Sequence, residues 1–175
     1  YKKDIFKRFF MEFNLPLENK KVKDASIEEA LLKLITGEER ELFRIVSDLS
    51  LDGKYGETLA EFTDKRIISV DKDNNGEIKT VFVDYSDIEK IFIKRMYGNA
   101  VLIAQKKDGG KISLIRSTYA VTALFNSATI FFEKINSGIS IDEAMESIDV
   151  AYKNFSTICP KCGRSDHGDN TRFER

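Results

Sequence analysis

The sequence predicts an α+β domain in which about seven antiparallel strands form a curled, partly open barrel closed by a C-terminal helix. Two features of the sequence lead to this prediction: short Val-, Ile- and Phe-rich segments are separated by turn residues, and a long segment with helical periodicity follows them. The chain has 175 residues and a mass of 20.0 kDa, enough to bury a hydrophobic core. We find no internal repeat of 20 to 50 residues.

Residues 1–37 predict an N-terminal helical lead. Within 1–13, apolar residues recur at helical spacing and lysines and an arginine fill much of the remaining surface. We expect this helix to dock on its own domain, with weak contact to an anionic membrane surface as the alternative. A second helix is predicted after the capping residues Asp24 and Ser26, ending near Thr36 because Gly37 follows.

Residues 38–137 predict the strand-rich domain and its closing helix. Glycine- and asparagine-containing turns such as Asp52–Gly53, Asn74–Gly76 and Asp108–Gly110 separate the strands, as expected for antiparallel hairpins. The predicted strands cover 42–49, 58–63, 66–71, 77–84, 88–95, 100–106 and 111–117.

Two helices are predicted after the last strand. The first is capped by Ser117 and Thr118 and ends at Ser137–Gly138. Four of its apolar residues are expected to pack on the sheet: Val121, Leu124, Ala128 and Phe132. Residues 138–156 predict a linker helix, and residues 157–175 predict half of a zinc ribbon and a polar tail.

Composition limits the classes of partner. The chain has 28 Lys and Arg residues against 29 Asp and Glu, a net charge of −1, so we expect no nucleic-acid binding. No apolar run is long enough to span a membrane, and the start of the chain does not resemble a secretory signal. We therefore expect a cytoplasmic location. Because the sequence starts at Tyr1 without a methionine, we also expect it to be part of a longer protein.

No catalytic or cofactor-binding residues are predicted. Residues 71–78 resemble the start of a calcium loop, but Phe82 stands where the bidentate glutamate is needed, which favours a hairpin turn. Gly109–Gly110–Lys111 lacks the rest of a phosphate loop and also indicates a hairpin. Asp84 and Asp87 are better explained as turn residues than as an acid–base pair.

Cys159 and Cys162 form the sharpest chemical signal. Two cysteines separated by two residues, the first of which is Pro160, and followed by Gly163 are typical of half a zinc ribbon. His167 is the candidate third ligand, so the predicted metal site is incomplete and we expect no cofactor in this chain alone. A loose thiol pair and a redox pair remain as alternatives, although a redox pair needs a preceding βαβ unit.

The segment Thr63-Asp64-Lys65-Arg66 before an apolar strand, together with residues 47–57, resembles a bacterial pleckstrin-homology-like module. Followed by a helical tail and Cys-Pro-Lys-Cys-Gly-Arg, it resembles the N-terminal cytoplasmic region of bacterial ATP-binding-cassette exporters, over about residues 38–164. The resemblance implies an accessory domain at the cytoplasmic side of the membrane, with ATP bound elsewhere in the longer protein. It also implies zinc at Cys159 and Cys162, completed by a downstream cysteine pair.

The predicted function is therefore a non-catalytic regulatory or assembly domain of an exporter. Its expected partners are proteins, either the exporter's own cytoplasmic parts or a second copy. The alternative is a free-standing lipid- or protein-binding module of the same type. The loop 51–56 offers only Lys54 for phosphate contacts, which disfavours lipid binding.

Overall fold

The computed structural model describes residues 22, 24–118 and 122–156. Its elements, in chain order, are α2 (Ala25–Leu34), β1 (Glu41–Leu49), β2 (Tyr55–Thr63), β3 (Arg66–Lys72), β4 (Ile78–Asp84), the 3₁₀ helix η1 (Tyr85–Asp87), β5 (Ile88–Met96), β6 (Asn99–Lys106), β7 (Lys111–Thr118), α3 (Thr122–Asn136) and α4 (Ile141–Ser156). The seven predicted strands and the predicted hairpins that join them are confirmed.

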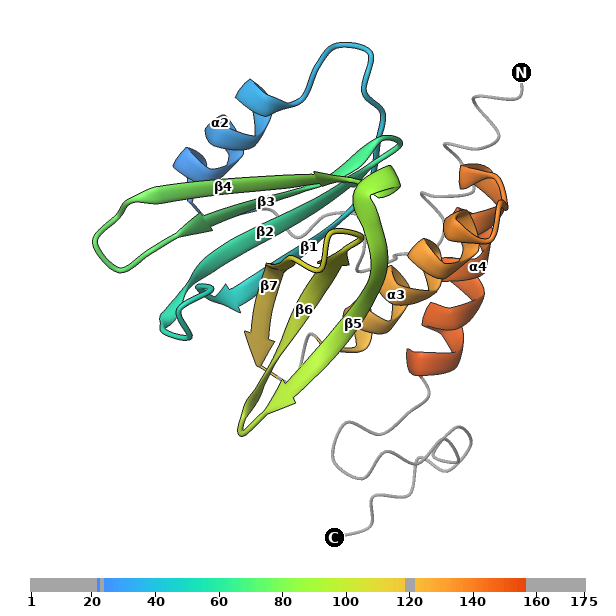
Figure 1. Cartoon of the computed structure of the whole chain (residues 1–175). Coiled ribbons are helices and arrows are strands. Elements are labelled where there is room, and N and C mark those ends of the chain that lie inside the picture. The colour runs from blue at the N-terminus through green and yellow to red at the C-terminus, as the bar shows by residue number, and fades with distance from the viewer. Residues whose placement is uncertain (1–21, 23, 119–121, 157–175) are drawn as a thin grey trace, which may run out of the picture.

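The strands form two antiparallel sheets rather than one barrel. Sheet 1 has the order β1-β2-β3-β4, and sheet 2 has the order β5-β6-β7 (Figure 1). The predicted curled, partly open barrel is divided into two sheets and is not closed, because η1 turns the chain between β4 and β5 and no backbone ladder joins β7 to sheet 1. The α+β class is confirmed.

Serine side chains join the two sheets where β7 crosses sheet 1. The Ser69 hydroxyl on β3 donates to the Leu114 carbonyl on β7 over 2.6 Å. The Ser47 hydroxyl on β1 contacts the Arg116 carbonyl, also on β7. These bonds satisfy carbonyl groups that would otherwise be left without partners at the edge of sheet 2.

The main core lies between the inner faces of the two sheets and helices α3 and α4. It includes Phe43 and Phe62 of sheet 1, Leu102 and Leu114 of sheet 2, and Phe131 of α3. Leu124, Ala128 and Phe132 are buried as predicted, whereas Val121 lies outside the described residues. Helix α4 adds Ala144, Met145 and Ile148 to the same core.

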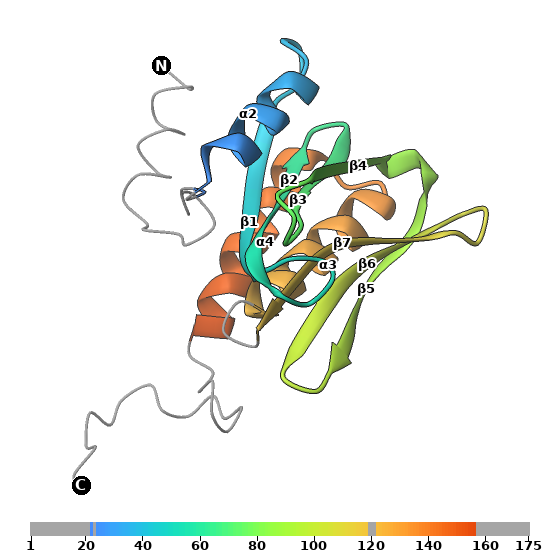
Figure 2. The same cartoon turned by 90° about the vertical axis from the view of Figure 1, so that its left-hand side faces the viewer.

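Helix α2 covers the other face of sheet 1, away from α3 and α4 (Figure 2). Its residues Ile27 and Leu31 are fully buried against Leu59 and Ile68 of the sheet. Asp24 caps the helix by accepting a hydrogen bond from the Ser26 backbone amide over 3.0 Å, as the sequence predicted. Sheet 1 is therefore covered on both faces.

No helix in the described part of the chain is both long and apolar enough to cross a membrane.

Candidate docking surface

The two sheets carry opposite charge. Residues 88–118, which form sheet 2, contain seven Lys and Arg against two Asp and Glu, a net charge of +5. Residues 41–84, which form sheet 1, contain six Lys and Arg against ten Asp and Glu, a net charge of −4. The near-zero net charge of the whole chain thus hides a local separation of charge.

The outer face of sheet 2 gathers much of this positive charge. Cross-strand pairing places Lys90 opposite Gln105 and Gln105 opposite Lys111, so these side chains share one face. By the same reasoning Lys94, Val101 and Arg116 share that face, and so do Phe92, Ile103 and Ser113. We call this surface the basic face and define it by Lys90, Phe92, Lys94, Val101, Ile103, Lys111 and Arg116.

An apolar centre lies between the cations of the basic face. Val101 and Ile103 are 5% and 8% exposed, although neither belongs to the two hydrophobic clusters of the interior. Phe92 is partly exposed, and the Lys90 ammonium lies 5.7 Å from its ring centroid. Lysine stems of this kind cover apolar surface while the charged group stays in water.

The cations of the basic face lack acidic partners within the described part of the chain. No ion pair involves Lys90, Lys94, Lys111 or Arg116. Lys90, Lys94 and Lys111 are exposed to solvent. These groups are available for charge-assisted hydrogen bonds to carboxylates.

Arg116 sits where β7 meets the β1–β2 loop. A Cβ atom at Gly53, which has φ +86°, would lie 2.2 Å from an Arg116 guanidinium nitrogen. The loop therefore needs glycine at this position both for its backbone conformation and for the space that Arg116 occupies. The buried Nε atom of Arg116 makes no hydrogen bond among the described residues. A buried donor without a partner carries a cost in free energy.

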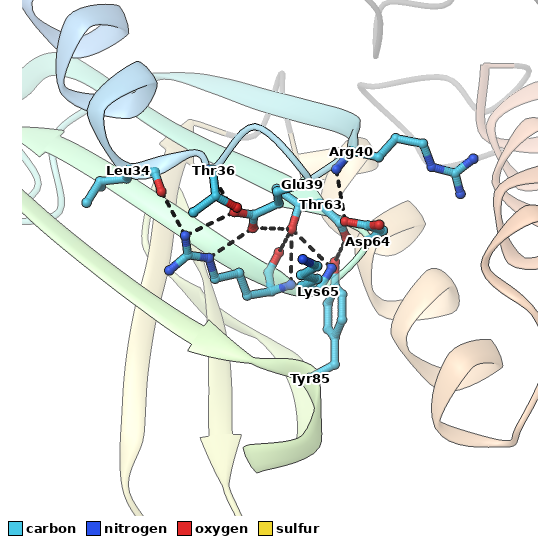
Figure 3. Close-up of polar contacts among 9 residues, drawn as sticks. Leu34, Thr36, Glu39, Arg40, Thr63, Asp64, Lys65 and Tyr85 are labelled. Carbon is cyan, nitrogen blue, oxygen red and sulfur yellow. Dashed lines mark hydrogen bonds and ion pairs between the residues drawn. The ribbon is translucent and has the colours of Figure 1, made fainter.

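The Thr63–Arg66 turn, which carried the sequence resemblance, forms a structural network instead (Figure 3). The Thr63 hydroxyl donates to Glu39 over 2.7 Å and accepts from the Arg66 backbone amide over 3.1 Å. Arg66 donates to both carboxylate oxygens of Glu39, at 2.9 and 3.0 Å, and to the Leu34 carbonyl at 2.8 Å. The turn therefore ties the β2–β3 hairpin to the end of α2.

Asp64 and Tyr85 extend this network. Asp64 accepts a hydrogen bond from the Arg40 backbone amide over 3.0 Å, and the Tyr85 hydroxyl donates to the Thr63 carbonyl over 2.7 Å. Figure 3 shows Asp64, which belongs to the turn, beside Arg40, and the Tyr85 side chain reaching the turn from below. The turn residues other than the exposed Lys65 are thus used in holding the fold together.

A second charged cluster lies between α2 and sheet 1. Glu61 is 1% exposed, and its carboxylate oxygen is 2.9 Å from Arg44 Nε without the geometry of a hydrogen bond. Arg44 also binds both carboxylate oxygens of Glu28, at 3.0 and 3.1 Å. Burial raises the pKa of Glu61 to about 8; Arg44 opposes the rise, and Glu41 and Glu28 reinforce it.

This pKa makes the free energy of unfolding depend on pH. Between its ordinary value of 4.5 and about 8, Glu61 is protonated in the folded chain and ionised in the unfolded chain. The folded state binds more protons there, so stability falls as pH rises through this window. We expect Glu61→Gln to be more stable than the wild type by about 1–3 kcal/mol at pH 8.5 and nearly equal at pH 5.

Urea denaturation at both pH values measures this difference, with the exposed Glu29→Gln on α2 as the control. If the free energy of unfolding of the wild type had the same pH dependence as that of Glu61→Gln, the raised pKa of Glu61 would be contradicted.

The residues predicted as metal ligands, Cys159, Cys162 and His167, lie outside the described residues, as does the predicted membrane-contacting segment 1–13. In the part of the chain that is described, no group of three or more His, Cys, Asp or Glu side chains is placed to hold a metal ion.

Asp71, the first residue of the calcium-like segment, is buried and accepts hydrogen bonds from the Leu51 amide and the Thr58 hydroxyl. It therefore has a structural role within sheet 1.

Comparison with known proteins finds similarity to solved structures alone. No family model matches the sequence, and no curated protein matches it. A crystal structure of a DUF1696 family protein with a pleckstrin-homology domain from Shewanella loihica PV-4 is 18% identical, with a TM-score of 0.42. The match covers 63% of this chain and 95% of that chain. This similarity assigns neither a family nor a function to this chain.

Proposed function

We propose that this chain is a non-catalytic docking domain that binds protein through the basic face of sheet 2. The observation that carries the proposal is a set of cations, without ion pairs among the described residues, around the apolar centre formed by Phe92, Val101 and Ile103. Unpaired charge of one sign attracts an oppositely charged partner over about 8–10 Å at ordinary salt. Apolar surface at the centre adds affinity when water is excluded.

The fold supports a docking role through its rigidity. Sheet 2 is held to the core on its inner face by Ile91, Leu102 and Leu114. A packed sheet holds its backbone in a fixed position, so binding orders exposed side chains alone. Such a surface recognises a partner without a change of its backbone.

We propose an ATP-binding-cassette exporter as the host of this domain. The support is the sequence resemblance that runs from the strand-rich region to the Cys-Pro-Lys-Cys-Gly-Arg segment, and the domain would then act at the cytoplasmic side of the membrane. In this role the chain contributes to assembly or regulation, and ATP hydrolysis belongs to another part of the exporter.

Deletion of residues 1–175 from the exporter that carries them tests this proposal. We expect basal ATP hydrolysis in detergent to be kept, and assembly or transport to be reduced, because docking is lost but chemistry is not. Loss of basal hydrolysis in a folded, ATP-binding remainder would show a catalytic contribution. Unchanged assembly and transport would show that the domain does not dock. A coding sequence without membrane-spanning and ATPase regions would remove the exporter as host.

A further inference from the structure

We propose that the partner of the basic face is an acidic, amphipathic protein segment that lies across strands β5–β7 and places a carboxylate against Arg116. This inference rests on the proposed docking function and adds the chemistry of the partner.

The cations stand in two rows on either side of the apolar centre. Lys90 and Lys94 lie four residues apart on β5, a separation of about 13 Å along the strand. Lys111 and Arg116 form the other row on β7, two strand spacings or about 10 Å away. An α-helix is about 10 Å wide, so one helix fits between the rows. Acidic residues along both flanks of that helix would meet both rows.

The depth of the apolar centre favours a protein segment over a lipid surface. Val101 and Ile103 are 5% and 8% exposed, whereas Lys90, Lys94 and Lys111 are exposed, so a flat layer of headgroups would contact mainly the ammonium groups. Apolar side chains projecting from a peptide reach between the rows once the flexible lysine stems move apart. The partner is therefore expected to carry apolar residues on one face and carboxylates beside them.

Arg116 favours a carboxylate at one defined position. One guanidinium nitrogen of Arg116 lies against Gly53 of the β1–β2 loop, which holds the group at one place beside the basic face. A carboxylate binds a guanidinium through two parallel hydrogen bonds, which a lysine cannot make. We therefore expect Arg116 to contribute geometric specificity and the lysines to contribute general attraction.

The test uses a fluorescein-labelled 16-residue peptide with leucine on one helical face and glutamate on both flanks. Fluorescence anisotropy measures its affinity for the full chain at two salt concentrations. A peptide of the same composition in scrambled order, and one with glutamine for glutamate, serve as ligand controls. We expect the amphipathic acidic peptide to bind at least about tenfold more tightly than either control and to weaken with salt.

The protein variants are matched in charge. Lys94→Glu with Lys111→Glu reverses two exposed cations of the basic face, and Lys33→Glu with Lys65→Glu reverses two exposed cations elsewhere. We expect the first pair to weaken binding at least about tenfold and the second pair to leave it nearly unchanged. Arg116→Lys keeps the charge and is expected to weaken binding about threefold or more, because the two parallel hydrogen bonds are lost.

Three results would overturn the inference. The first is peptide affinity that is equal in wild type and in Lys94→Glu/Lys111→Glu. The second is binding to phosphatidylcholine vesicles with 30% phosphatidylserine, dependent on the same lysines, without peptide binding. The third is self-association in sedimentation that the same variant abolishes, which would make a second copy the partner. If the peptide does not bind but the exporter's assembly still depends on the domain, this inference alone fails and the docking function stands.

Discussion

Replacement of Phe131 by alanine is expected to lower the free energy of unfolding by about 3–5 kcal/mol. Phe131 is fully buried on α3 and its ring packs edge-on against Phe43 at 5.3 Å and Phe62 at 6.4 Å between centroids. It also contacts the ring of Tyr85 at 5.9 Å. The substitution removes apolar contacts between α3 and sheet 1 and leaves a cavity that the surrounding β-sheet cannot close.

Urea denaturation followed by circular dichroism measures the loss, and Phe82→Ala is the matched control. Phe82 is 53% exposed and its ring lies 4.9 Å from the Arg66 guanidinium carbon, so its removal is expected to cost less than about 1 kcal/mol. Equal effects of the two substitutions would contradict the position of α3 in the core.

Replacement of Arg66 by methionine is expected to cost about 3–5 kcal/mol at neutral pH. The Glu39 side chain is 1% exposed and loses two of its hydrogen bonds, which leaves a buried carboxylate without its cation. Arg66 is also the main reason that the pKa of Glu39 is lowered to about 2, with Thr63 and the Thr36 amide contributing. Without Arg66, burial raises this pKa.

The pH dependence gives this prediction a second readout. In the wild type, Glu39 contributes stability above its ordinary pKa of 4.5, and this stability is lost as pH falls through about 2. In Arg66→Met we expect no such decrease in the free energy of unfolding at acid pH. Without the Arg66 cation, the buried Glu39 side chain stabilises the folded state better when it is protonated than when it is ionised. Arg40→Met is the control: the Arg40–Asp142 pair is 55% and 66% exposed and is expected to contribute less than about 1 kcal/mol. If Arg66→Met lowered the free energy of unfolding as little as this control does, the stabilising role of the Glu39–Arg66 hydrogen bonds would be contradicted.

The sequence identified the strands because their signals are local. Asn74, Gly76, Gly98 and Gly109 mark hairpin turns, and three of these residues, the glycines, have positive φ in the structure. The division into two sheets was not predicted, because strand spacing does not record which strand edges pair. That division depends on η1 and on side-chain contacts such as Ser69 with Leu114, between residues far apart in the chain.

The basic face was missed for a related reason. Strict alternation would place Lys111 and Arg116 on opposite faces of β7, because they are five residues apart. An irregularity in the β6–β7 register between Leu102 and Ile103 shifts the alternation, so that both face outward. The excess of lysine and arginine in residues 88–118 could be counted in the sequence, but the sequence did not show that Lys111 and Arg116 lie on the same face of the sheet. The motif Thr63–Arg66 was found correctly as a turn, and its side chains hold the fold.

The serine bonds between the sheets have a mechanical consequence. Within each sheet, a force along the strands must break a backbone ladder, whereas between β7 and sheet 1 it meets the side-chain bonds of Ser47 and Ser69 and the apolar packing around them. Helices α3 and α4 follow β7 in the chain, so tension applied at the end of α4 reaches this junction before it reaches sheet 1. The junction is a plane of low shear resistance. Under load we therefore expect the two sheets to separate at this junction before the hydrogen bonds inside each sheet break.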